Sequence, residues 1–253
     1  MGTSIYIASD CGAVSIIHDV QGYAETPEDA VADVLKAGMD VECGTYTQQH
    51  AVAALQQKKL IEADIDRALI NLFSVRIRLG LFDPTASDKL FGNIRATEVC
   101  SQEHRDLALE AARDGIVLLK NTANLLPLSK SKTTSLGVIG PNADSPQVLL
   151  GNYEGIPCKT TTTLQALQSY VHKVEYEPGC DTVECLSDRV DEALRVAREV
   201  DQVVLVMGLD QSQEREKKDR EDLVLPPKQQ KLVVTVAGVA KNVVVLVLLW
   251  RSC

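Results

Sequence analysis

The spacing of hydrophobic residues divides the chain into parts with different expected structures. In residues 1–80, short apolar segments alternate with stretches whose apolar residues recur at helical spacing. Thr26 precedes Pro27 and two acidic residues, a combination that is typical of a helix N-terminus. This alternation predicts part of an α/β domain. Helices are expected at residues 27–36, 47–57 and 62–79, a strand at residues 5–8, and a short strand and turn at residues 39–44.

A more regular α/β pattern begins at residue 134. Residues 203–207 and 243–249 are continuous apolar runs, which are typical of central parallel strands covered on both faces. Before this region, Ser101 precedes a predicted helix over residues 102–120, whose apolar stripe is expected to pack where two domains meet. Strands are expected at residues 136–139, 173–176, 202–207 and 243–249, and helices at residues 164–171, 187–200 and 227–240.

Composition and charge narrow the classes of partner. The 253 residues are 45% hydrophobic and 24% charged, as in an ordinary globular protein. The net charge of −9 argues against nucleic acid as the main partner, because phosphate backbones attract basic surfaces. The longest apolar run, residues 243–250, falls far short of the roughly 20 residues that a membrane-spanning helix needs. The N-terminal residues also lack the pattern of a signal peptide.

Seven cysteines are many for a protein of this size. Cys180 and Cys185 flank a polar turn, and Cys11 and Cys43 each follow a predicted strand, so both pairs are candidate disulfides. Buried free thiols are an equally weighted alternative, and Cys253 is the residue expected to stay unpaired. A mixture of this kind is typical of secreted proteins. Because the histidines are scattered and paired Cys-x-x-Cys motifs are absent, no metal site is expected.

Asp10 is the first candidate for chemistry. It follows an apolar, strand-like segment and Ser9, so its carboxylate is expected where a buried strand opens into a loop. In barrels of alternating strands and helices, that end of the strand carries the catalytic residues. An Asp after a strand is more often a turn former, so the residues alone leave both roles open. Glu214 and Glu216 lie in a charge-rich run that is more typical of a solvated surface.

Several segments, in order along the chain, resemble glycoside hydrolase family 3. They are residues 7–11, 37–44, 76–83, 110–121, 125–128, 138–143 and 151–155. The match is closest to the plant β-D-xylosidase/α-L-arabinofuranosidase branch. Cys11, where many other members have Trp, favours this branch, as do residues 151–158 and 208–211.

The resemblance implies a (β/α)8-type barrel joined to an α/β sandwich, and a retaining mechanism with two carboxyl groups. It implies that Asp10 is the catalytic nucleophile. Alignment on the pair Asp219-Arg220 makes Glu216 the general acid/base, with Glu214 as the alternative. No cofactor is implied. The expected substrate is a xylan- or arabinan-type oligosaccharide of the cell wall, and the expected location is extracellular.

The expected fold is therefore α/β, made of two partial domains and a connection. Residues 1–82 are interpreted as the end of the barrel domain with most strands missing. Residues 83–133 are interpreted as a linker and interdomain helix, and residues 134–253 as an incomplete α/β sandwich with a mostly parallel sheet. Weak or no hydrolysis of xylosides is expected of such a chain. The alternatives are a non-catalytic sugar-binding or interaction protein and an unrelated doubly wound small-molecule binder. Neither the preference between xylose and arabinose nor the oligomeric state follows from the sequence.

Overall fold

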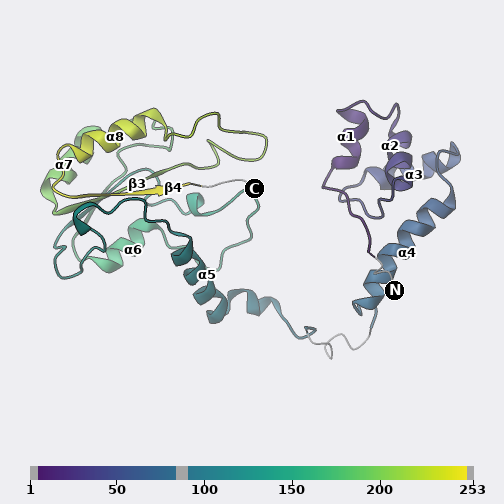
Figure 1. Ribbon diagram of the computed structural model, residues 1–253, viewed down its shortest axis with the longest axis horizontal. Coiled ribbons are helices and arrows are strands. Elements are labelled where there is room, and N and C mark those ends of the chain that lie inside the picture. The colour runs from purple at the N-terminus through teal and green to yellow at the C-terminus, as the bar shows by residue number, and fades with distance from the viewer. Residues whose placement is uncertain (1–4, 84–90, 250–253) are drawn as a thin grey trace. The chain divides into compact units, whose positions relative to one another are not determined.

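The computed structural model describes residues 5–83 and 91–249 (Figure 1). The chain forms two compact units, Met1–Arg95 and Ala96–Cys253. Because each unit has its own internal contacts, each is described by itself.

The first unit is a group of four helices. Thr26 caps α2 as predicted, because its hydroxyl accepts a hydrogen bond from the Asp29 backbone N–H. The predicted helices are confirmed to within a residue or two, whereas α1 was not predicted, since it has only seven residues and begins after Gly12 in a left-handed conformation. The helices are α1 (Ala13–Asp19), α2 (Pro27–Lys36), α3 (Tyr46–Gln56) and α4 (Glu62–Arg78). Their shared core comprises Val14, Val31, Ala32, Leu35, Met39, Ala54, Leu60 and Ala68.

The two strands predicted in this unit form only a minimal pair. Residues 5–8 and 39–44 come together in a single parallel bridge between Ala8 and Val41. A parallel pair needs further strands on either side to become a stable sheet. Within residues 5–83 no other strand flanks this pair, which explains why the apolar pattern gives an extended segment and not a full strand.

The second unit begins with a short 3-10 helix, η2 (Ala96–Cys100), and the helix α5 (Gln102–Gly115). Ser101 caps α5 by accepting the His104 backbone N–H. The helix was predicted to continue to residue 120, but it ends at Gly115, where a residue of low helix propensity precedes the β-branched Ile116. The apolar side chains of α5 are exposed, so their packing between domains stays a prediction.

A four-stranded parallel sheet forms the centre of the second unit. Its strand order is β2-β1-β3-β4, and all four strands were predicted. In Figure 1, α7 and α8 cover one face of the sheet and α6 covers the other. The strands are β1 (Leu136–Ile139), β2 (Val174–Glu177), β3 (Gln202–Gly208) and β4 (Val243–Leu248). The helices are α6 (Thr163–Tyr170), α7 (Val190–Glu199) and α8 (Pro227–Ala237), with short 3-10 turns η3 (Thr122–Asn124) and η4 (Gln147–Leu149).

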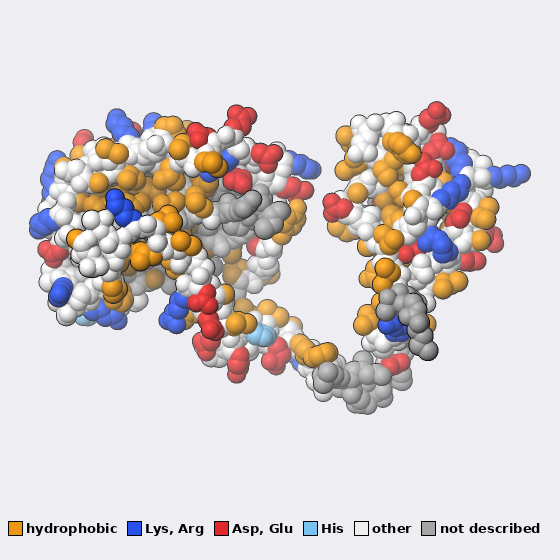
Figure 2. Space-filling view, in the orientation of Figure 1, with side chains coloured by type: hydrophobic (Ala, Val, Ile, Leu, Met, Phe, Trp, Pro, Cys, Tyr) orange, Lys and Arg blue, Asp and Glu red, His pale blue; other side chains and the backbone are white. Residues whose placement is uncertain are grey.

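Two separate hydrophobic cores lie on the two faces of this sheet. Leu205 and Met207 of β3 pack with α7 and α8, while Val204 and Val206 pack on the face of α6. This burial on both faces explains why β3 is continuously apolar from Val203 to Met207. Figure 2 shows that hydrophobic side chains also reach the surface, and Val245 on β4 is 43% exposed.

Two of the strands end at glycines that the backbone requires. A Cβ added to Gly140, just after β1, would lie 2.0 Å from the Val206 carbonyl oxygen. A Cβ added to Gly208, at the end of β3, would lie 2.0 Å from the Leu248 carbonyl oxygen. Glycine therefore permits the close approach of neighbouring strands at the carboxyl end of the sheet, where the loops that carry the candidate site residues begin.

Candidate active site

Asp10 lies between residues that are bound to the segment 41–43. The Ser9 backbone N–H donates to the Val41 carbonyl oxygen at 2.9 Å, and the Gly12 backbone N–H donates to the Cys43 carbonyl oxygen at 2.8 Å. The Asp10 side chain itself is exposed. The backbone on both sides of Asp10 is thus fixed while its carboxylate faces the solvent.

The two carboxylate oxygens of Asp10 have different environments. Oδ1 accepts a hydrogen bond of 2.8 Å from the Cys11 backbone N–H. Oδ2 makes no hydrogen bond to any residue within 5–83 or 91–249. The Asp10 carbonyl oxygen accepts from the Ala13 N–H at 3.1 Å and so starts α1. This arrangement holds one oxygen and leaves the other available to attack an electrophile.

A disulfide between Cys11 and Cys43 fixes the same segment covalently. The Cα atoms of the two cysteines lie 4.4 Å apart, and the Cys43 backbone N–H donates to Ser9 Oγ at 3.0 Å. The predicted pairing of these two cysteines is confirmed, and the alternative of free thiols at these positions is wrong. Cys11 is therefore part of the support of the residue that precedes it.

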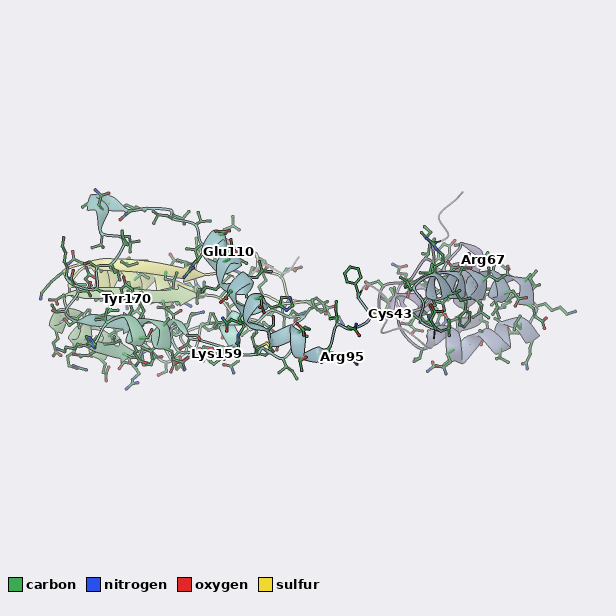
Figure 3. All side chains as sticks on the ribbon, turned by 90° about the horizontal axis from the view of Figure 1, so that it is seen from below. Cys43, Arg67, Arg95, Glu110, Lys159 and Tyr170 are labelled. Atoms are coloured by element: carbon green, nitrogen blue, oxygen red, sulfur yellow. A yellow bond between two sulfur atoms is a disulfide. The ribbon has the colours of Figure 1, made fainter. Side chains whose placement is uncertain are left out.

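An ion pair between Asp40 and Arg67 also holds this segment in place. The Asp40 side chain is only 2% exposed, and its Oδ1 accepts from Arg67 of α4 at 2.7 Å and from Asn71 at 3.1 Å. Its Oδ2 accepts the Ile7 backbone N–H at 3.0 Å. Arg67, labelled in Figure 3, also donates to the carbonyl oxygens of Leu35 and Met39. This ion pair was not predicted, because two residues 27 positions apart on different elements share no sequence pattern.

A second polar group joins α1 to α3. The Tyr46 hydroxyl lies 3.1 Å from His18 Nδ1 and donates to Asp19 Oδ1 at 3.2 Å. Burial raises the pKa of the Tyr46 phenol, and the nearby Asp19 carboxylate raises that pKa further. A phenol with a raised pKa stays protonated and acts as a donor, so this group has a structural role.

Glu216 lies at the tip of a tight turn that follows β3. Arg215 and Lys218 exchange backbone hydrogen bonds of 3.0 and 2.9 Å, and Lys217 has a left-handed conformation with φ of 65°. Glu216 is exposed. Glu214, the alternative acid/base, is half-buried and its N–H donates to the Asp210 carbonyl oxygen at 3.2 Å. The turn thus presents the Glu216 carboxylate to solvent at the end of a loop that β3 carries.

A small hollow of about 210 Å³ lies at the base of this loop. Its lining side chains are two carboxylates, two amides, a hydroxyl and one apolar side chain. Glu216 is not among the lining residues, which are Gln147, Leu150, Glu154, Asp210, Gln211 and Ser212. The hollow was not predicted from the sequence.

Two further disulfides lie in the second unit. The predicted pair Cys180–Cys185 is confirmed, with Cα atoms 4.7 Å apart. The pair Cys100–Cys158 was not predicted, because 58 positions separate the two residues. The expectation of an unpaired Cys253 lies outside the described residues.

Within residues 5–83 and 91–249, no three side chains of His, Cys, Asp or Glu gather as they would around a metal ion. In the same ranges, no helix combines the length and apolar character that crossing a membrane requires.

The second unit is an α/β domain, with a parallel sheet and helices on both of its faces. Residues 116–252 match the glycosyl hydrolase family 3 C-terminal domain, so the chain belongs to glycosyl hydrolase family 3. The relatives that the chain resembles in sequence are named as xylosidases. The chain is 62% identical to probable beta-D-xylosidase 7 of Arabidopsis thaliana over 244 residues, which are 96% of this chain and 32% of that protein.

Two other comparisons agree with this family. The chain is 44% identical to beta-xylosidase/alpha-L-arabinofuranosidase 1 of Medicago sativa subsp. varia, covering 96% of this chain and 31% of that protein. A solved structure of the GH3 exo-beta-xylosidase XlnD, in complex with a xylobiose aziridine activity-based probe, matches with a TM-score of 0.87 at 35% identity. That match covers 95% of this chain and 31% of the other. The chain therefore spans about a third of the length of these relatives.

Proposed function

We propose that this chain carries both catalytic carboxyl groups of a retaining glycoside hydrolase, with Asp10 as nucleophile and Glu216 as general acid/base. The enzyme removes xylosyl or arabinofuranosyl groups from oligosaccharides, and this chain, which spans about a third of its relatives' length, is expected to do so at most weakly. The observation that carries the proposal is the Asp10 carboxylate itself, which is exposed, held by one oxygen and free at the other. Membership of the family and the names of the relatives support the substrate class.

The chemistry proceeds in two displacements. Asp10 Oδ2 attacks the anomeric carbon while Glu216 gives a proton to the leaving oxygen, and the glycosidic C–O bond breaks. Glu216 then takes a proton from water, whose oxygen displaces Asp10 and regenerates the free enzyme. In retaining enzymes the two carboxyl groups stand about 5–5.5 Å apart. The exposed turn of residues 215–218 suits an acid/base that a loop brings to the substrate.

The disulfides support an extracellular location for the protein. Three disulfides form within the described residues, and structural disulfides persist in oxidising compartments. We place the protein with its substrate in the cell wall. Detection of the native chain with its disulfides intact in cell-wall extracts, and its absence from cytosolic fractions, checks this location.

Hydrolysis of 4-nitrophenyl β-D-xyloside and 4-nitrophenyl α-L-arabinofuranoside by the purified chain tests the function. Asp10→Asn should abolish release of nitrophenol. Glu216→Gln should lower the rate by roughly 10² to 10⁴-fold, the range that general acid/base groups contribute, and azide should restore part of that rate by replacing water as the attacking group. Glu214→Gln is the matched control and should retain activity.

The outcomes separate the residue assignments from the function. If Glu214→Gln is inactive and rescued by azide while Glu216→Gln is active, the acid/base is Glu214. If the unchanged chain releases no nitrophenol and no inhibitor labels Asp10, the hydrolase proposal is wrong.

A second candidate function is binding of a sugar without hydrolysis. The hollow lined by Asp210, Gln211 and Ser212 favours this second function, because all of its lining residues belong to the second unit. Titration with xylobiose, followed by changes in amide hydrogen exchange at residues 147–154 and 210–212, tests this function. Binding that persists in Asp10→Asn without any hydrolysis would support it, and unchanged exchange would exclude it.

A further inference from the structure

We infer that the Cys11–Cys43 disulfide and the Ser9 hydroxyl position the Asp10 carboxylate, so that Cys11, Cys43 and Ser9 are positioning residues for the nucleophile. The inference rests on the proposed function for its catalytic meaning. Its structural content, that these three residues hold the backbone around Asp10, stands on the contacts of the first unit alone.

Four attachments join the residues on either side of Asp10 to residues 41–43. Before it, Ser9 bonds to Val41 through its N–H and to Cys43 through its hydroxyl. After it, Cys11 is joined covalently to Cys43, and Gly12 donates to the Cys43 carbonyl oxygen. Asp10 is the one residue between 9 and 12 that makes no bond to this segment. All of the neighbouring bonds converge on residues 41–43, so their combined effect is to fix the direction of the Asp10 Cα–Cβ bond.

The disulfide is important because the strands alone provide little support. Only Ala8 and Val41 form a ladder bridge here, and a single parallel bridge has no cooperative partner on either side. The hydrogen bond from the Cys43 N–H to the Ser9 hydroxyl is exposed at the surface, where water competes with it. A covalent link does not exchange with water. We therefore infer that the Cys11–Cys43 disulfide holds this segment in place, as hydrogen bonds to neighbouring strands do in a complete sheet.

The carboxylate depends on this support through the Cys11 amide. Oδ1 accepts the Cys11 N–H at 2.8 Å, so any rotation of the 10–11 peptide turns the carboxylate with it. Misplacement of a reacting group by about 1 Å can cost about 100-fold in rate. Loss of the disulfide should therefore affect the chemical step more than the binding of the sugar, which depends on other groups.

The double variant Cys11→Ser/Cys43→Ser tests the inference in the full chain. Cys100→Ser/Cys158→Ser is the matched control, because it removes an exposed disulfide from the other unit. Ser9→Ala is a milder variant that keeps the disulfide and removes only the acceptor for the Cys43 N–H. It keeps the test valid even if the double cysteine variant folds poorly.

The first measurement is the rate at which a xylobiose-configured aziridine alkylates Asp10, mapped by mass spectrometry. In this step an Asp10 oxygen forms a C–O bond to the ring carbon, the C–N bond breaks, and the nitrogen takes a proton from the general acid. The maximal alkylation rate should fall by about 10- to 100-fold in Cys11→Ser/Cys43→Ser, with the half-saturating concentration little changed. Ser9→Ala should show a smaller fall, and the control none. A purely structural role would lower the amount of folded protein without changing the rate for each folded molecule.

The second measurement is amide hydrogen exchange over residues 9–13, which needs no catalysis. Exchange should become at least tenfold faster in Cys11→Ser/Cys43→Ser and stay unchanged in the control. If Asp10 reacts at the same rate in all variants, the positioning role is wrong while the proposed function stands. If Asp10 of the unchanged chain never reacts, the proposed function is wrong. Exchange then decides the positioning: protection lost with the disulfide supports it, and unchanged protection overturns it.

Discussion

Replacing the half-buried Arg67 with Met should destabilise the first unit. Arg67 donates to Asp40 Oδ1 at 2.7 Å, to the carbonyl oxygen of Leu35 in the last turn of α2, and to that of Met39 beyond the helix. Met fills a similar volume but donates nothing. The change leaves the Asp40 carboxylate, whose side chain is 2% exposed, without its cationic partner.

The size of the effect follows from these contacts. Breaking a buried ion pair by removing one partner costs about 3–5 kcal/mol. Arg67 is 38% exposed, so water can reach part of the vacated site. Asn71 and the Ile7 N–H continue to bind Asp40. These two facts lower the expected loss to about 2–4 kcal/mol.

Amide hydrogen exchange measured peptide by peptide is the suitable assay, because two units need not unfold together. Exchange in α2 and α4 should accelerate by the factor that corresponds to this loss, roughly 30-fold to 1,000-fold. Arg76→Met is the matched control, since Arg76 lies on the same helix, is exposed, and lies over the ring of Phe73 at 5.9 Å. Exchange in Arg67→Met that stays within threefold of the unchanged chain would refute the role of the ion pair.

Two other predictions concern the second unit. Gly208→Ala should destabilise the sheet by about 3 kcal/mol or more, because its Cβ would lie 2.0 Å from the Leu248 carbonyl oxygen. Gly155→Ala, with no atom within 4 Å, should change the urea midpoint little, and equal midpoints for the two variants would contradict the argument. The pKa of Asp201 is lowered by hydrogen bonds from the hydroxyls of Thr134 and Ser135. The stability that Asp201 contributes is therefore present above its unfolded pKa near 4 and is lost as the pH falls through its lower folded value. Asp201→Asn should flatten this part of an acid titration followed by circular dichroism, and an unchanged acid limb would exclude the effect.

The second unit was predictable because its strands are buried on both faces. In β3, six of the seven residues are buried, so neither face allows a polar position, and the continuous apolar run from Val203 to Met207 marks it in the sequence. Among the flanking helices, α6 begins at Thr162, whose hydroxyl accepts a hydrogen bond from the Gln165 backbone N–H. Local chemistry and burial point to the same elements here, and the predicted boundaries agree with the structure to within a few residues.

The first unit was less predictable because its support is tertiary. The segments 5–8 and 39–44 have strand-like patterns, yet the structure forms a single bridge between them. What holds them is the Cys11–Cys43 disulfide and the Asp40–Arg67 ion pair. The disulfide could be proposed because both cysteines follow predicted strand ends. The ion pair could not, since Arg67 looks like any other arginine on an amphipathic helix.

The two candidate catalytic residues also differ in how far the sequence alone points to them. Asp10 stands out in the sequence through its place at the end of an apolar segment, and its contacts agree with a fixed backbone and an exposed carboxylate. Glu216 was selected only through the family resemblance. Its position on an exposed turn is what its charged neighbours suggest, and no local pattern distinguishes it from Glu214. Both catalytic assignments stay predictions until the variants are measured.

The Cys100–Cys158 disulfide has a consequence for how this protein survives digestion. It closes a ring of the chain that contains all of α5 and β1. A protease that cuts once inside this ring leaves two pieces that remain joined through sulfur. Such nicked molecules should run as two shorter bands on a gel with reductant and as one band without it.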